Sequence, residues 1–521
     1  MKSQILHIFK NDVSHLWREI VLMAAIVIAY GWQQSSHPQE PAIFGSSAGF
    51  SISGQILSLL VLLCFIFLIQ RVVYAECPVG DRQFWVTRPY DWRQLLTEKI
   101  LFLVAFVNLP LFVLQAFLLW HTGFGPARYI SALLEFQWHW LLFVILPVGT
   151  LAVVTAGIGQ FVLSLLGVLL YLIVIGTLMM KVPNIGVEGA SGIPTVITTY
   201  GIYAAGIAVV LWQYARRSTV RSRAVLLGVA AAITILFAAT PYRAVITHIY
   251  PVPVPGSTLP VQLAFDPAKP ASLKGGYFEE NKVHIMLPLL VSGIAEGSKV
   301  SVSGKLARIE VPGGPRWDSG WQAQGENLLP SRPRTSEIFA LEKDFFERVK
   351  SMPANVHLTL ALTPARAVEV ERVVAGPGPF SFPGDGRCFF SSFARNRAVC
   401  FFPPQKTQSM LLSAKSEEIT CKPGEDAKPL PAGTIAYGWV WQMGDFGLNP
   451  VSASALELSD LGELDARTFH RGVCPGTALT VYTGWREGPR YRTDLEINGI
   501  HLTDYKLDDS PEPGGFGVMV P

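Results

Sequence analysis

The stretch ISGQILSLLVLLCFIFLIQRVVYAECPVGDRQFWVTRPYDWRQLLTEK, from Ile52 to Lys99, joins an apolar run to a segment crowded with charges and aromatics. A helix needs about 20 apolar residues to cross the hydrocarbon core of a bilayer, and Ile52–Tyr74 is long enough. The charged side chains between Glu76 and Pro89 are too costly to bury in hydrocarbon. The sequence therefore predicts a membrane span that leaves the bilayer, folds briefly outside it and returns.

Apolar runs of this length recur through residues 1–250 of the 521-residue chain, half of which is hydrophobic. We predict a polytopic α-helical membrane domain over residues 17–246, with six to seven spans in contact with the lipid bilayer. The fourth and fifth spans lie in one apolar tract, which we divide near Gly157 and Gly159. The candidate spans are Trp17–Trp32, Ile52–Tyr74, Ile100–Trp120, Trp138–Gly157, Gly159–Met180, Ile197–Trp212 and Ala224–Ile246.

Charge divides the chain at about the same place. Residues 1–250 contain 15 of the 42 Lys and Arg residues and 9 of the 39 Asp and Glu residues, which leaves 27 and 30 for the remainder. The first half is therefore poor in charge and net positive, whereas the second half has the composition of a soluble domain. Neither half has the strong basic field that would indicate a nucleic-acid partner.

The Lys and Arg residues of the first half are unevenly shared among the loops. They concentrate in the amino-terminal lead, between Arg82 and Lys99, and in the loop 213–223, whereas loops 33–51, 121–137 and 181–196 hold one each or none. Short loops rich in Lys and Arg stay on the cytoplasmic side of a membrane. We therefore expect an inner-membrane, multi-pass protein with a cytoplasmic N-terminus and, after seven spans, an extracytoplasmic region beyond about residue 247.

Four of the six cysteines lie in that expected extracytoplasmic region: Cys388, Cys400, Cys421 and Cys474. An even number of cysteines in an exported domain predicts two disulfides, with three possible pairings. Four buried, unpaired cysteines are the alternative.

The amino-terminal lead has helical spacing of its apolar residues, among them Ile5, Phe9 and Leu16, with Lys10 and Asp12 on the other face. This pattern predicts an amphipathic helix over residues 1–20 that lies on the cytoplasmic membrane surface and then turns into the first span. A plain extension of the first span is the alternative.

A second helix start is predicted inside the charged segment. Asp91 is followed three residues later by Gln94, as in a helix N-cap, and Pro89 disfavours helix at the residue before it. We expect a helix that begins at Trp92 and continues into the third span. The segment before it reads as a short cytoplasmic element, or else as a plain loop with aromatic anchors at the interface.

The remainder of the chain is predicted to be mainly β, after a Pro-rich linker over residues 247–260. Short β-rich runs over residues 261–521 predict a sandwich-like extracytoplasmic domain, with a possible seam near 376–386. One helix is expected from Ser336, with Ile338 and Leu341 on its buried face. Asn498-Gly499 predicts a two-residue hairpin turn.

Motifs for chemistry are missing from the sequence. It has no phosphate-binding P-loop, no zinc-protease motif and no nucleophile elbow. We therefore predict no catalytic residues, no metal site and no cofactor on this chain.

The polar residues inside the spans are expected to join helices, and Asn108-Leu109-Pro110 predicts a kink. These polar residues are Gln55, Gln70, Asn108, Gln115, His139 and Gln160.

The order of these features resembles the membrane subunit of type-2 ABC exporters. The family often has Glu, then Gly-Thr, a Leu-rich turn, Pro, Leu-Leu and Lys between its second and third spans. The matching residues here are Glu76, Gly80, Phe84-Trp85, Thr87-Arg88-Pro89, Leu95-Leu96 and Lys99, with Gly80-Asp81 in place of Gly-Thr. The resemblance covers about residues 1–217. It does not cover a seventh span or the β-rich domain.

The resemblance implies that this segment contacts a separate cytoplasmic ATPase subunit, which binds ATP and Mg, and that a second permease protomer, identical or not, completes the complex. It also implies that Lys181–Ile197 dips back into the membrane. The implied ATPase-contact residues are Glu76, Gly80, Arg82, Phe84, Trp85, Arg88, Pro89, Asp91, Trp92 and Arg93.

Three functions remain open at this point. The first is a permease subunit of an ABC transporter complex. The second is a polytopic anchor or sensor whose β domain binds a ligand or an envelope partner, because a simple permease does not need such a domain. The third is a membrane-tethered enzyme, for which a catalytic cluster would be required.

Overall fold

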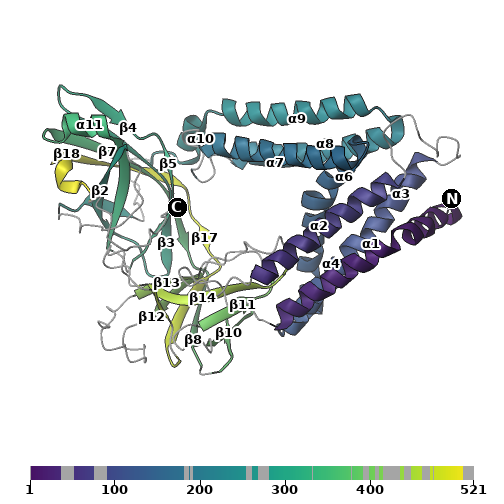
Figure 1. Cartoon of the computed structure of the whole chain (residues 1–521). Helices are drawn as coiled ribbons and strands as arrows, with labels where there is room; N and C mark the ends of the chain where they lie inside the picture. The colour runs from purple at the N-terminus through teal and green to yellow at the C-terminus, as the bar shows by residue number, and fades with distance from the viewer. Residues whose placement is uncertain are drawn as a thin grey trace.

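The computed structural model describes residues 2–36, 52–75, 91–180, 187, 192–253, 261–267, 281–330, 333–376, 378–390, 398–404, 410–414, 434–438, 448–459, 470–472 and 475–507. A helix bundle forms the first half and a β-rich region the second (Figure 1). The helices are α1 (Lys2–Ser36), α2 (Ile52–Tyr74), α3 (Trp92–Leu103), η2 (Val104–Asn108), α4 (Leu109–His121), η3 (Pro126–Tyr129), α5 (Ile130–Trp140), η4 (Leu141–Ile145), α6 (Leu146–Val154), α7 (Ile158–Met180), α8 (Gly192–Arg216), α9 (Thr219–Ala239) and α10 (Tyr242–Ile249).

Seven helical stretches in the described part of the chain are long and apolar enough to cross a membrane. Seven such helices agree with the prediction of six to seven, and the tract divided near Gly157 and Gly159 is broken where α6 ends at Val154 and α7 begins at Ile158. Large apolar side chains such as Leu163 and Ile173 on α7 are mostly exposed. A soluble surface rarely carries apolar patches of this extent, so the helices indicate a membrane-embedded protein.

The first and third spans are longer than predicted. The first is a single unbroken helix, α1, which already includes the amino-terminal lead. The third begins at Trp92, as predicted, and runs through a π-turn, Val104–Asn108, directly before Pro110. The same arrangement recurs in the fourth span, where the π-turn Leu141–Ile145 precedes Pro147. Proline cannot donate to the helix ladder, and an inserted π-turn is one way to accommodate that loss.

The β-rich region has two lobes. The first lobe is a sandwich of a three-stranded sheet, in the order β1-β2-β6, and a six-stranded sheet, β17-β7-β3-β4 with β18 on β7 and β5 on β3. Its core contains Ile285 and Phe339 from the small sheet and Val302, Ile309 and Leu360 from the large one. The elements are β1 (Gln262–Phe265), β2 (Lys282–Ser292), β3 (Ser298–Glu310), β4 (Arg316–Asp318), β5 (Gln322–Leu328), β6 (Arg334–Glu342), α11 (Lys343–Val349), β7 (Pro353–Arg366), β17 (Arg486–Glu487), β18 (Tyr491–His501) and η6 (Leu502–Tyr505).

The second lobe is inserted between β7 and β17, and it is one nine-stranded sheet in the order β8-β16-β12-β13-β14-β11-β10-β9, with β15 on β14. Cys388 on β10 and Cys400 on β11 are register partners and form a disulfide in its core. The other two candidates, Cys421 and Cys474, lie outside the described residues. The strands are β8 (Glu369–Val374), β9 (Phe380–Phe382), β10 (Gly386–Phe390), β11 (Ala398–Phe402), β12 (Met410–Ala414), β13 (Thr434–Gly438), β14 (Ser452–Ser459), β15 (His470–Gly472) and β16 (Ala478–Thr483).

Two local predictions in the first lobe were wrong. The helix expected from Ser336 is strand β6 up to Glu342, because Glu337, Phe339 and Leu341 alternate into the core, and only α11 is helical. Asn498-Gly499 is not a hairpin turn: β18 pairs with β7 on both sides of it, with a register shift between Ile497 and Ile500. Gly499 takes a positive φ of 71° in this bulge.

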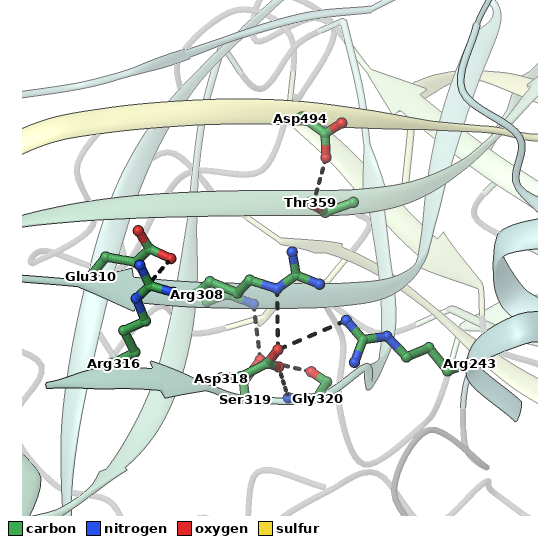
Figure 2. A network of polar contacts seen from close by, with 10 residues as sticks. Arg243, Arg308, Glu310, Arg316, Asp318, Ser319, Gly320, Thr359 and Asp494 are labelled. Atoms are coloured by element: carbon green, nitrogen blue, oxygen red, sulfur yellow. Dashed lines mark hydrogen bonds and ion pairs between the residues drawn. The ribbon is translucent and has the colours of Figure 1, made fainter.

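The first lobe packs on α10 at the end of the last span. Tyr242, Ile246 and Tyr250 are buried with Leu306 and Trp321 of the lobe. A polar network lies beside this contact (Figure 2). Arg308 and Arg243 both reach Asp318, at 3.1 and 3.9 Å, so that Arg243 links α10 to the sheet. The loop between β4 and β5 is held by the Asp318 side chain, which accepts from the Gly320 amide.

Val187 is the one described residue between Met180 and Gly192, in the segment that we expected to re-enter the membrane. It is buried against the first lobe, where a Cβ built on Gly304 would lie 2.8 Å from one of its methyl groups. This point of the segment therefore lies against β3. Residues 192–197, the last part of the predicted re-entry, are the first residues of helix α8, and residues 181–186 and 188–191 lie outside the described residues.

Candidate functional site

The predicted ATPase-contact segment ends in a well-formed helix start. Asp91 takes an extended conformation and its carboxylate accepts from the Arg93 amide at 3.3 Å, which confirms it as the N-cap of α3. Arg93 is exposed and its guanidinium lies 5.4 Å from the centre of the Trp92 ring. The other seven predicted contact residues, from Glu76 to Pro89, lie outside the described residues.

Directly behind this helix start lies a buried ionic cluster that the sequence analysis did not find. Lys99 Nζ of α3 lies 2.5 Å from Asp12 Oδ2 of α1 and 3.2 Å from Glu98 Oε2. All three side chains are at most 3% exposed. Charges this deeply buried need partners at close range, because an isolated ion loses its hydration without compensation. The cluster therefore fixes α3 to α1 at one defined position.

The sequence analysis placed Asp12 on the polar face of the amino-terminal helix. In the structure, the buried face of this helix includes Asp12. Ile8, Asp12 and Leu16 are buried at intervals of four residues, and the stripe continues through Met23 and Val27. Lys99 could have indicated this burial from the sequence, because a charged residue at the edge of a predicted span usually pairs with a residue on a neighbouring helix.

A second tie joins α1 to α2, and a third joins α2 to the turn between α6 and α7. Arg71 Nη2 lies 3.4 Å from Glu19 Oε1, partly exposed. Tyr74, the last residue of α2, shares a hydrogen bond of 2.5 Å with the Thr155 hydroxyl and donates to the Gly157 carbonyl at 3.2 Å. The end of α2 is thus held against the start of α7.

The remaining helices are tied at the same end. Arg223 of α9 donates through Nε and Nη2 to the carbonyl of Val154, the last residue of α6, at 3.0 and 2.8 Å. A cation at a helix C-terminus is favourable because the carbonyls there carry partial negative charge. The buried Gln213 of α8 donates to Thr219 and accepts from Ser222, which joins α8 to α9.

These contacts lie at the amino-terminal end of the bundle, and the β-rich region lies at the opposite end (Figure 1). We call them the polar end: Asp12, Glu19, Arg71, Tyr74, Glu98, Lys99, Val154, Thr155, Gln213, Ser222 and Arg223. Together they link α1, α2, α3, α6, α8 and α9 and the turn that precedes α7.

A smaller polar chain lies deeper in the bundle. Asn108, in the first π-turn, donates to Gln137 at 3.2 Å, and Gln137 donates to the buried Gln115 at 2.8 Å. These contacts join the third span to the fourth, which is the helix-joining role predicted for Asn108 and Gln115. Gln137 was not singled out in the sequence.

The described residues include no group of three or more His, Cys, Asp or Glu side chains placed to hold a metal ion. The polar end consists of ion pairs and hydrogen bonds between helices.

Comparison with known proteins leaves the family undetermined. No protein-family model matches the chain, and a search of curated proteins returns no match.

Proposed function

We propose that the chain is the permease subunit of a type-2 ABC transporter complex, which moves a substrate across a membrane with ATP hydrolysed by a separate cytoplasmic subunit. The observation that carries this proposal is the position of the buried Asp12–Lys99–Glu98 cluster, about two helical turns behind the helix start at Asp91. A partner that pushes on Glu76–Arg93 would move α3, and the cluster would pass that movement to α1.

The sidedness of the chain supports the same function. Disulfides persist in oxidising compartments, so the Cys388–Cys400 bond favours an extracytoplasmic β-rich region. The polar end lies at the other end of the bundle and would then face the cytoplasm, where the ATPase subunit is. The Lys and Arg distribution among the loops favours the same orientation in the inner membrane.

In this proposal the chain contributes no catalytic group. Nucleotide binding by the partner would bias the helix bundle between two arrangements, and a second permease protomer would complete the pathway. The exposed Asp91 and Arg93 and the half-buried Trp92 would form the described part of the contact surface.

The test is purification of the full chain in mild detergent from its native membrane, with mass spectrometry of the proteins that remain bound. We expect a separate ATPase in near-stoichiometric amount with the wild type and its loss from the double variant Arg88→Glu, Arg93→Glu. The matched control Arg316→Glu, Arg348→Glu reverses two charges on exposed residues of the first lobe, and it should retain the ATPase.

A second candidate function is an anchor or sensor whose β-rich region binds a ligand or an envelope partner. Its support is the size of that region, from Gln262 to the end of the chain. If the purification yields no ATPase and yields only proteins that are lost when the β-rich region is removed, this second function replaces the first.

A further inference from the structure

The two lobes of the β-rich region contact different parts of the helix bundle. The first lobe contacts α10 and Val187, at the end of the last span. The second lobe contacts the connection between the third and fourth spans, residues 122–129. The chain passes between the lobes twice, at Ala367–Val368 and at Gly484–Trp485.

The second-lobe contact is polar at its edge. Asp385 lies in the turn between β9 and β10 with a positive φ of 59°, which non-glycine residues seldom adopt. Its Oδ2 accepts from the Tyr129 hydroxyl at 3.1 Å and lies 3.0 Å from Arg128 Nη2. Arg387, two residues on, lies over the Phe124 ring at 5.4 Å. The turn is thus held in an unusual conformation where it meets the helices.

The same contact is apolar at its centre. Leu448 is fully buried and is a member of the core of the helix bundle, which also contains Tyr30 of α1, Leu118 of α4 and Trp140 of α5. It is not a member of the second lobe's core as far as that core is formed by described residues. Val451, three residues on, is buried with Leu119 and Phe124.

The segment that carries these two side chains is stiff. Between them, Asn449 accepts from the Val451 amide through Oδ1 at 3.0 Å, and Pro450 has a fixed φ. Leu448 is therefore presented to the bundle by a short turn that is rigid in itself.

From these observations we infer that the second lobe is a latch that holds the helices together at the end of the bundle opposite the polar end. The latch consists of the buried Leu448 side chain and of the polar contacts that Asp385 makes with Arg128 and Tyr129. While Leu448 is seated, the third and fourth spans are held against α1. The helices can part at this end only when the lobe withdraws Leu448, by bending at Val368 and Gly484, where Gly484 has a positive φ of 66°.

The latch is a property of the fold, whatever drives the helices. Its opening can be measured in native membranes without nucleotide, with Leu118→Cys as a reporter, next in sequence to Leu119, which is buried with Val451 of the second lobe. Leu95→Cys, buried at the polar end, is the matched reporter. Each is treated in open membrane fragments, whose two faces are both accessible, with a water-soluble maleimide, and labelling is read on the reporter's own peptide by mass spectrometry.

The latch variant combines Leu448→Ala with Asp385→Asn, which keeps a residue that tolerates positive φ. We expect Leu118→Cys to react at least about tenfold faster in this variant, since losing one charged hydrogen bond shifts a local opening equilibrium by roughly that factor. Leu95→Cys should not change. Asp318→Asn, at the first-lobe contact, is the control variant and should leave both reporters unchanged (Figure 2).

Equal labelling of Leu118→Cys in the latch and control variants would overturn the inference. If both reporters become faster, the latch variant has unfolded, and Arg128→Gln decides instead, because it leaves the second lobe intact. Faster labelling of Leu118→Cys alone then supports the latch, and unchanged labelling overturns it. The labelling experiment uses neither nucleotide nor an ATPase subunit, so it tests the latch even if no ATPase co-purifies with the chain.

Discussion

Lys99 on α3 and Asp12 on α1 form an ion pair of 2.5 Å with both side chains almost fully buried, 87 residues apart in the sequence. Removal of one partner leaves a buried charge without compensation, which typically costs about 3–5 kcal/mol. We expect Lys99→Met to lower the free energy of unfolding by that order, measured by thermal unfolding in detergent.

The matched control is Arg71→Met, which breaks the partly exposed Arg71–Glu19 pair of the same end. Exposed pairs contribute up to about 1 kcal/mol, so this variant should be much milder. The double variant Asp12→Asn, Lys99→Met should lose less than the two single variants together, because the partners share one interaction. Similar losses in Lys99→Met and Arg71→Met would contradict a structural role for the cluster.

Glu337 gives the first lobe a pH dependence of stability. Burial raises the pKa of Glu337 to about 7, and Lys305 Nζ, 3.0 Å away, opposes that rise, while Glu326 adds to it. The folded chain therefore binds a proton that the unfolded chain has released above its ordinary pKa of 4.5. The contribution of Glu337 to the free energy of unfolding should be fully present below about pH 4.5 and should be lost as pH rises to about 7, by up to roughly 3 kcal/mol.

The thermal unfolding midpoint of the first lobe is measured in the full chain between pH 5 and pH 8. Hydrogen exchange of β6, the strand that carries Glu337, reports the unfolding of this lobe. Glu337→Gln should remove most of the decline, whereas Glu487→Gln, on an exposed residue, should keep it. A decline that persists unchanged in Glu337→Gln would assign it to another group.

The sequence predicted the helix bundle well because membrane spans are long and their signal is compositional. The start of α3 at Trp92 was also predictable, because an N-cap is a local feature. Asp12 could not be placed, since its burial depends on Lys99, a partner on another helix. The hairpin turn predicted at Asn498-Gly499 was wrong for a similar reason. Strand β7 pairs with β18 on both sides of these residues, and this tertiary pairing overrides the local turn preference.

The close approach of Val187 to β3 predicts a size limit at Gly304. A Cβ there would lie 2.8 and 3.0 Å from the two methyl groups of Val187. Gly304→Ala should therefore force the segment away from the first lobe and speed hydrogen exchange of α10, which belongs to the same cluster. Val187→Ala in the same chain should restore the exchange, since it removes both methyl groups. Gly325→Ala, with open space around its Cβ, is the control.

The Cys388–Cys400 disulfide closes a short loop, with a sequence separation of 12, in the core of the second lobe. A loop of about this size is worth about 3 kcal/mol in the chain-entropy account. Cys388→Ala with Cys400→Ala should therefore lower the unfolding midpoint of the second lobe and leave that of the first lobe unchanged. Asp385 and Arg387 lie on the turn and strand beside Cys388, so the same variant should also weaken the contact with Arg128 and Phe124.

Limited proteolysis of the full chain tests both expectations. Cleavage should increase within β8–β16 and within residues 122–129, while Cys64→Ala, a variant of a free cysteine on α2, should give the wild-type pattern. If cleavage increases equally in both lobes, the disulfide stabilises the whole region and not the second lobe alone.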